Sequence, residues 1–386
     1  MRDLSDSPDT ITSFNLRAIR LFAPLLIVLA GSTVAYAGAQ SKISRVSTTR
    51  EFFNPTLRET VSLEIEPAVS GTVRITVVDR DGFPIRHLEE QRAERNRKVV
   101  ARWDGRDDAG SVVPDEAYSF KVDLVTSAGT ETYFPALKPA RSFTIRADSF
   151  DSVGGILHYN LPVACRVHIQ AGSAKFDKAG NADGPVLKTI VNRAPRAKGA
   201  VVEHWSGFDE SGTIKVSEME NFVIAIAPTS LPENSVLTTG NRQLSFLGYA
   251  ESRGGQSLLP RPEHRDHQHR HHAGLSALED HSPSLNVVPA DASWIAEERV
   301  WTTAANEMIV RLDLAGPTAS KFAEQPGRIA VFVNQRQVLE VKPASATTIT
   351  IPLPRGTGDH IVALNWASEY GPVAVNSFRV RKSPKS

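Results

Sequence analysis

Hydrophobic and polar residues alternate along several stretches in the first third of the chain. Val73, Ile75 and Val77 are separated by polar residues, and the same alternation recurs across residues 118–124. A period of two residues places one side of an extended strand on a core and the other side in water. Several such strands in one region pack as two facing sheets. We therefore predict a β-sandwich over residues 38–146.

The next region repeats the first. Phe120, Val122 and Leu124 correspond to Phe222, Ile224 and Ile226 at an offset of 102, and Ile65, Val73 and Ile75 correspond to Tyr159, Val167 and Ile169 at an offset of 94. The difference, 102 − 94 = 8, predicts a longer surface loop within residues 173–185. We predict a second β-sandwich over residues 147–240. At the offset of 94, Cys165 replaces Gly71 at the start of a strand, so we expect its thiol to be partly exposed.

The clearest part of the repeat is a tryptophan motif. Residues 103–110 read WDGRDDAG, and residues 205–212 read WSGFDESG. The indole at the end of a strand predicts a core residue, and the Asp and Gly residues after it predict a tight turn. The motif positions are Trp103, Asp104, Gly105, Asp107 and Gly110 in the first copy and Trp205, Gly207, Asp209 and Gly212 in the second.

A calcium loop is the alternative interpretation of this motif. It would use Asp104, Asp107 and Asp108, but their spacing is not that of a calcium-binding loop and no Glu follows to close it. In the second copy Asp104 is replaced by Ser206, which removes one of the carboxylates. Turn chemistry is therefore the favoured interpretation of both copies.

These residues resemble a known family. Residues 77–88 and 99–124 look like the immunoglobulin-like module of flagellar hook-capping proteins, over about 70 residues. The matching positions are Val77, Asp79, Gly82, Arg86, Leu88, Trp103, Asp104, Gly105, Asp107, Gly110, Tyr118 and Val122. The resemblance implies two tandem immunoglobulin-like modules in an exported, multi-module bacterial protein, and it implies no catalytic residues.

The remainder of the chain divides into a linker and a third module. Residues 241–288 are polar and carry neither a strand nor a helix period, which is typical of a disordered linker. Alternation returns in residues 289–386, which lack the tryptophan motif, and predicts an immunoglobulin-like C-terminal sandwich. The predicted fold class is all-β, with tandem immunoglobulin-like or fibronectin-like β-sandwiches and a flexible histidine-rich linker.

Residues 1–37 have the pattern of a secretory signal peptide. Arg17 and Arg20 precede an apolar run, and the run ends in the small-residue pattern Ala35-Tyr36-Ala37. Cleavage there would place the mature protein in the periplasm, in the medium or on the cell surface, with no stable membrane span. An uncleaved anchor is the alternative, although the strongly apolar part is short for a span.

Composition excludes several classes of protein. The 386 residues carry a formal net charge of +1, which is far from the basic excess of a nucleic-acid binder. Cys165 is the single cysteine, so the chain has neither an internal disulfide nor a cysteine-based metal site.

The linker contains a dense histidine tract. It holds six of the eleven histidines: His264, His267, His269, His271, His272 and His281. Neutral imidazoles at this density bind Zn, Cu or Ni, but a flexible tract holds such ions loosely. No other cofactor is expected.

Three functional hypotheses follow. We favour a non-enzymatic scaffold or adhesion-type protein of the bacterial envelope, whose partners are other envelope or extracellular proteins, or polysaccharide, because no catalytic motif occurs in the sequence. A periplasmic metal-binding protein that acts through the histidine tract is the first alternative. The second alternative is carbohydrate recognition, by a platform of Trp294, Trp301 and Trp366. A carbohydrate-active enzyme using Asp104 and Asp107 ranks last.

Overall fold

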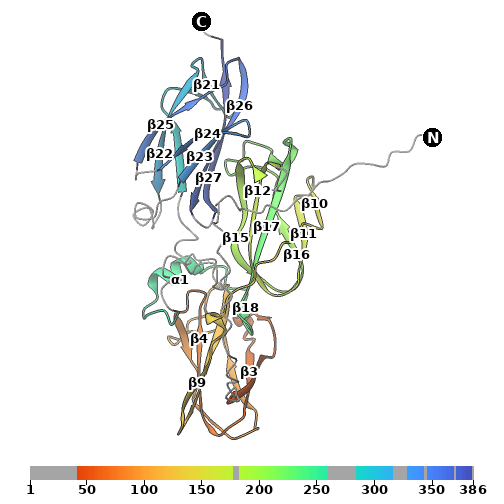
Figure 1. Ribbon diagram of the computed structural model, residues 1–386, viewed down its shortest axis with the longest axis vertical. Helices are drawn as coiled ribbons and strands as arrows, with labels where there is room; N and C mark the ends of the chain where they lie inside the picture. Colours follow the sequence, from red (N-terminus) through yellow and green to blue (C-terminus); the bar gives the residue numbers. More distant parts are fainter. Residues whose placement is uncertain are drawn as a thin grey trace, which may run out of the picture.

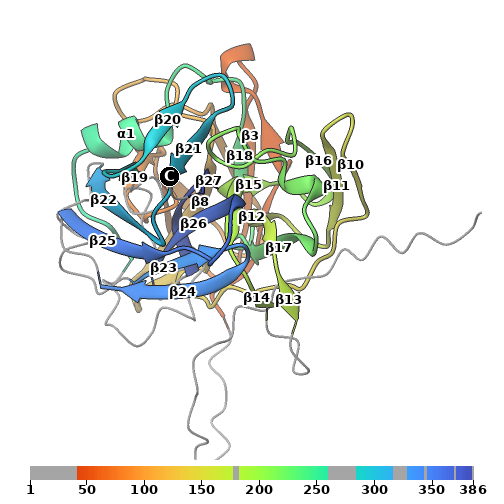
Figure 2. The same ribbon diagram turned by 90° about the horizontal axis from the view of Figure 1, so that it is seen from above.

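The chain folds into three β-sandwiches that lie beside one another (Figures 1 and 2). The computed structural model describes residues 41–176, 182–259, 284–315, 328–342, 346–368 and 371–384. Strands account for most of these residues, which confirms the predicted all-β class. We name the three sandwiches the first, second and third modules in chain order. The signal peptide and the histidine tract lie outside the described residues.

The first module consists of two facing sheets. One sheet has the order β1-β3-β7, and the other has the order β2-β18-β8-β4-β5, with β6 and β9 on its margins. Its strands are β1 (Ile43–Thr48), β2 (Phe52–Phe53), β3 (Val61–Pro67), β4 (Gly71–Val78), β5 (Pro84–His87), β6 (Gln91–Ala93), β7 (Val99–Trp103), β8 (Ala117–Thr126), β9 (Gly129–Tyr133) and the distant β18 (Val236–Thr238).

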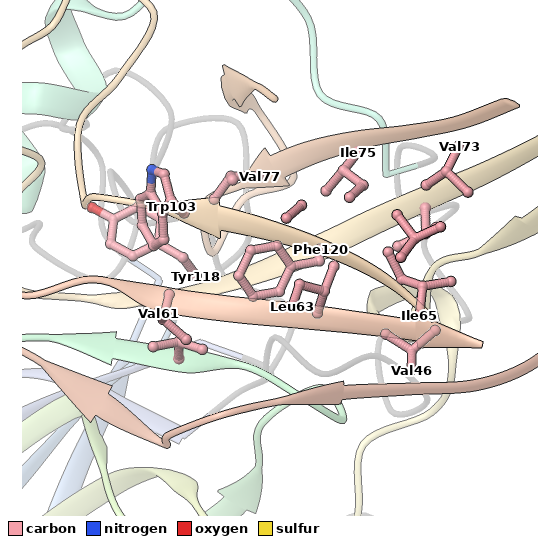
Figure 3. Packing of buried hydrophobic residues seen from close by; sticks show 14 of the residues in the cluster. Val46, Val61, Leu63, Ile65, Val73, Ile75, Val77, Trp103, Tyr118 and Phe120 are labelled. Atoms are coloured by element: carbon pink, nitrogen blue, oxygen red, sulfur yellow. The ribbon is translucent and has the colours of Figure 1, made fainter. Parts of the chain in front are cut away.

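The core of this module lies between the alternating faces that the sequence predicted (Figure 3). Val73, Ile75 and Val77 of β4 and Leu63 and Ile65 of β3 are at most 2% exposed and face one another across the sandwich. Each strand thus buries every second side chain, and the hydrophobic effect holds the two sheets together.

The second module repeats this arrangement with small sheets. Their orders are β10-β11-β16 and β15-β12-β17. Its strands are β10 (Ser149–Asp151), β11 (Ile156–Leu161), β12 (Cys165–Ser173), β15 (Val186–Arg196), β16 (Gly199–His204) and β17 (Phe222–Ser230). The eight extra residues fall where they were predicted, in a hairpin of β13 (Lys175–Phe176) and β14 (Ala182–Asp183).

The pairing register of the repeat differs by two residues from the one that the two offsets predict. In the first module Ile75 pairs with Val122, so the offsets would pair Ile169 with Ile224. Ile169 instead pairs with Ile226. A shift of two residues leaves every side chain on its original face, so the hydrophobic pattern does not distinguish the two registers.

The chain returns to the first module after the second one ends. β18 lies between β2 and β8 of the first module, parallel to β2 and antiparallel to β8. Val236 is fully buried in the first module's core. The second module is therefore inserted into the first, and the predicted second sandwich of residues 147–240 ends near Ser230. The first module is therefore completed by β18, which lies about a hundred residues after β9 in the sequence.

The next residues continue along the surface of the first module. The sequence predicted a disordered linker that begins at residue 241. Residues 240–259 instead have defined structure, which includes helix α1 (Phe246–Ser252). We call residues 240–259 the strap. Its helix begins at Ser245, whose hydroxyl accepts a hydrogen bond from the Gly248 N–H at 3.1 Å. Residues 260–283 of the predicted linker lie outside the described residues.

The third module is an independent sandwich that begins at Ser284. Its sheets have the orders β19-β22-β25 and β20-β21-β27-β26-β23-β24. Its strands are β19 (Ser284–Pro289), β20 (Ser293–Ile295), β21 (Val300–Thr303), β22 (Glu307–Ala315), β23 (Arg328–Val333), β24 (Arg336–Val341), β25 (Ala346–Pro352), β26 (Gly358–Ser368) and β27 (Gly371–Lys382).

Candidate functional site

Both tryptophan motifs form a corner at the end of a strand. The Trp103 indole donates to the Arg106 carbonyl at 2.9 Å, and the Trp205 indole donates to the Phe208 carbonyl at 2.8 Å. Gly105 has a φ of +73°, and a Cβ there would lie 2.4 Å from Pro55, so only glycine fits the corner.

The aspartates of the motif are used within the corner itself. Asp107 accepts the Ser111 N–H at 2.8 Å, and Asp104 accepts the Arg106 N–H at 3.2 Å. In the second copy, Asp209 accepts the N–H groups of Thr213 and Ile214 at 2.8 and 2.9 Å. These bonds use the Oδ1 atom of each aspartate and hold the turn in place, as the turn interpretation of the motif predicts.

The two corners differ in what covers them. The Ser377 hydroxyl of the third module donates to Asp209 at 2.7 Å, and Arg299 of that module donates to the carbonyls of Ser211 and Gly212 at 3.3 and 3.2 Å. In the first copy, Tyr249 of the strap lies against the module's core. The second corner therefore forms part of the joint between the second and third modules.

A buried amide completes this second joint. Asn365 is 4% exposed, and its side-chain oxygen and nitrogen bond the N–H and carbonyl of Val186 at 2.8 and 2.6 Å. The side chain takes the place of a neighbouring strand's peptide group. Phe332 and Ala363 of the third module pack into the second module's core cluster beside it.

The joint between the first and second modules is a buried line of charges. Glu116 of the first module accepts two hydrogen bonds from the Arg166 guanidinium of the second, at 2.8 and 3.2 Å. Arg80 lies 3.8 Å from Glu116 on one side and 3.8 Å from Asp81 on the other. Arg166, Arg80 and Glu116 each have at most 5% of their side chain exposed.

The strap supplies the last member of this line. Arg253 forms ion pairs with Asp79 and, at 2.6 Å, with Asp81, and its guanidinium lies 3.9 Å from the ring centre of Phe83. The Leu258 N–H donates to the Gly82 carbonyl at 2.8 Å beside it. We call Arg166, Glu116, Arg80, Asp81, Asp79 and Arg253 the charge line. Fully ionised, it contains three cations and three anions, so its charges cancel.

Burial perturbs one acid of the charge line strongly. Desolvation raises the pKa of Asp79 to about 7, although Arg253 and the N–H groups of Phe83 and Asp81 oppose this. The nearby carboxylate of Asp81 adds to the rise. Asp79 thus changes its charge near neutral pH.

The structure separates the residues of the carbohydrate hypothesis. Trp366 is fully buried in the third module's core, so it cannot join a surface platform. Trp294 and Trp301 lie opposite each other on β20 and β21 with ring centres 5.1 Å apart, and Trp294 is 45% exposed. Trp301 packs against the third module's core.

The remaining predicted features lie elsewhere. Cys165 is fully buried, which corrects the expected partial exposure, and burial raises the pKa of its thiol to about 12. Outside the unplaced histidine tract, the described ranges contain no group of three or more His, Cys, Asp or Glu residues able to hold a metal ion. None of the helices in those ranges has the length and apolar character needed to cross a bilayer.

Sequence patterns missed the charge line. Arg166 falls on the polar side of an alternating strand, in line with His168 and Gln170, so the pattern places it in water; Arg80 and Asp81 form part of what reads as an ordinary turn. An arginine at such a position gives no signal of burial, although one that is buried needs a charged partner. The sequence does not indicate which of its many acids that partner is.

Comparison with known proteins finds weak structural neighbours and no family. No protein-family model matches the chain, and no curated protein sequence matches it. Among solved structures, FlgD from P. aeruginosa is 23% identical over 27% of this chain and 73% of its own, with a TM-score of 0.18. A tetra-tandem repeat from the extending region of a large adhesion protein is 11% identical, over 88% of this chain and 73% of its own, with a TM-score of 0.19.

The central fibronectin-III array of RIM-binding protein is a third such match. It is 12% identical over 89% of this chain and 97% of its own, with a TM-score of 0.17. These TM-scores are too low for any of the three to serve as a template for function. The likeness to the hook-capping family is one of fold.

The charge line predicts a large cost when one partner is removed. Arg166→Met leaves Glu116 buried with only the more distant Arg80, so we expect the free energy of unfolding to fall by about 3–5 kcal/mol. Lys98→Met is the control, because Lys98 pairs with Glu64 at 2.8 Å on the surface and should cost less than about 1 kcal/mol. Urea denaturation measures both, and equal losses would contradict the burial argument.

Asp79 predicts a pH dependence with a definite sign. Its pKa is about 7 in the folded chain against an ordinary value of 3.8, so the folded state binds more protons between these values. The contribution of Asp79 to stability therefore falls as pH rises through this range, by about 1 kcal/mol per pH unit. Asp79→Asn removes this contribution, so the stability of the native chain relative to the variant should decline from pH 4 to pH 7. A difference that is flat or rising would contradict the assignment.

Proposed function

We propose that the protein is an exported, non-enzymatic structural protein of the bacterial envelope, which acts as a spacer, scaffold or adhesion-type element. One observation carries the proposal: buried contacts join the three modules to one another. The first joint buries the ion pair of Glu116 and Arg166, and the second buries the amide of Asn365 against Val186. Phe332 and Ala363 of the third module add apolar contact across the second joint, and apolar contact is what restrains relative motion of modules in one chain.

The connections between the modules support the same proposal. Only the short stretch after Leu137 leads into the second module, and only Leu231–Ser235 lead out of it. Asn234 donates to the Val46 carbonyl at 2.9 Å and to the Tyr133 hydroxyl at 2.8 Å, which fixes the outgoing stretch on the first module. The outgoing connection of the second module is thus fixed on the first module.

The sequence resemblance to the hook-capping module also supports the proposal. The matching residues of the hook-capping module fold here into the first module's strands and corner. On the basis of residues 1–37 we further propose export to the periplasm or the cell surface, with other envelope proteins or extracellular polysaccharide as partners. A metal-binding role for the histidine tract stays a prediction.

Cell fractionation combined with crosslinking tests this proposal. The full chain, expressed in a Gram-negative bacterium, should be recovered from the envelope or the medium, and a chain without residues 1–37 should stay in the cytoplasm. Crosslinking of the native envelope should capture a specific assembly partner. Asn365→Ala loosens the second joint, so it should keep export but reduce the crosslinked complex.

A matched surface variant is the control for this experiment. Lys98→Ala removes an exposed ion pair far from either joint and should leave both export and crosslinking unchanged. Retention of the full chain in the cytoplasm, or an exported chain that captures no partner, would contradict the proposal.

A further inference from the structure

The route of the chain attaches both ends of the second module to the first. Ser230 donates its N–H to the Arg141 carbonyl at 2.8 Å, and the Arg141 N–H bonds the Ser230 hydroxyl at 2.9 Å. Outside this pair, Lys138 and Glu233 form an ion pair at 3.5 Å. The two ends of the second module are thus adjacent. The chain then completes the first module with β18 and the strap before it continues to the third.

We infer that tension applied between the two ends of the chain passes through the first and third modules and bypasses the second. This inference deepens the proposed function, because a spacer or adhesion element works under tension, and it rests on that proposal for its biological setting. A force that enters at Ser41 and leaves beyond the strap stretches the first module. While that module stays folded, its own contacts hold the two ends of the second module together.

The first module has the strand geometry that resists such a force. β2 and β18 form a parallel pair, in which the Leu237 N–H donates to the Glu51 carbonyl at 2.8 Å and the Thr239 N–H donates to the Phe53 carbonyl at 3.1 Å. The incoming chain first passes through β1, which pairs antiparallel with β3, and then reaches β2 at one end of this ladder, whereas the outgoing chain leaves β18 at the other end. Tension therefore slides the strands along each other and loads their hydrogen bonds together.

The third module repeats this geometry. β21, which lies near the start of the module, pairs in parallel with β27, the last strand of the chain. The ladder joins Trp301 to Val380 and continues to Thr303, whose carbonyl accepts the Ser383 N–H at 2.9 Å. The chain again enters and leaves this ladder at opposite ends.

The second module has the opposite geometry. Its first segment pairs antiparallel with its last strand, through the bridges Ser142 to Thr229 and Ile145 to Ile226. Both chain ends lie at the same end of this ladder, so a force applied to them would break its bonds one after another. The module with the weaker geometry is the inserted one, and tension on the whole chain does not reach it once its contact with the third module has been released.

The contact between the second and third modules yields before either of the loaded modules. No covalent connection joins these two modules directly, because the chain runs between them through β18, the strap and residues 260–283. Tension on the chain ends first pulls against Asn365, Ser377 and Arg299 at this joint. Its release lengthens the molecule without unfolding a module.

Single-molecule force spectroscopy with two handle placements tests the inference. The first placement has handles at residues 41 and 384 of the full chain, and the second has handles at Lys138 and Glu233, whose side chains are 63% and 62% exposed. In the second placement the second module should open at about half the force or less that the first module withstands, with a gain of roughly 330 Å. In the first placement that gain should occur only with or after the opening of the first module. If the length gain of the second module precedes the opening of the first module, the inference that tension bypasses the second module is wrong.

A pair of variants tests the parallel ladder separately from stability. Thr239→Pro removes the N–H that bonds Phe53, at a residue whose side chain is exposed. Val73→Ala destabilises the same module through its core, away from the ladder. After correction for melting temperature, Thr239→Pro should lower the opening force of the first module more than Val73→Ala does. Equal effects would overturn the role of the ladder. Both measurements use the isolated protein, so their outcome does not depend on export or on a partner.

Discussion

Glu116 contacts the second module, its own first module and the returning strand β18. Its carboxylate receives Arg166 of the second module and lies near Arg80 of its own. Its backbone N–H donates to the Thr238 hydroxyl at 3.1 Å. Its carbonyl accepts the Thr238 N–H of the returning strand at 2.9 Å. A buried carboxylate is tolerable only while its cationic partners stay in place, so the insertion of the second module and the closure of the first depend on each other.

The tryptophan corner has a structural role in both modules and an additional contact role in the second. Both copies keep an indole bonded to a carbonyl three residues later, because this contact fills the core and turns the chain. The surfaces of the two corners differ. Asp209 accepts a hydrogen bond from the Ser377 hydroxyl of the third module in addition to the hydrogen bonds of its own turn. A repeated structural motif has thus become a docking position in one copy, and its chemistry remains that of a turn.

Local patterns predicted those parts of the fold that local physics decides. Alternation across Val73 to Val77 identified a strand and its buried face, and the repeat located the second sandwich and its extra hairpin. The insertion was missed because β18 is three residues long and its partner Tyr118 precedes it by more than a hundred residues. Arg253 was missed for a related reason, since its helix has no long apolar period and finds its partners, Asp79 and Asp81, only in the folded chain.

The claim that residues after the second module complete the first can be tested directly. Arg141 and Ser230 are hydrogen-bonded neighbours, so residues 141–230 can be replaced by a short Gly-Ser linker. Because the deletion also removes Arg166, the shortened chain carries Glu116→Gln to remove the charge that Arg166 neutralises. The account predicts that this chain, ending at residue 259, unfolds cooperatively in urea and protects the amides of β8 from hydrogen exchange, whereas residues 41–140 alone do neither. If residues 41–140 fold alone with the same stability, β18 and the strap are not part of the first module.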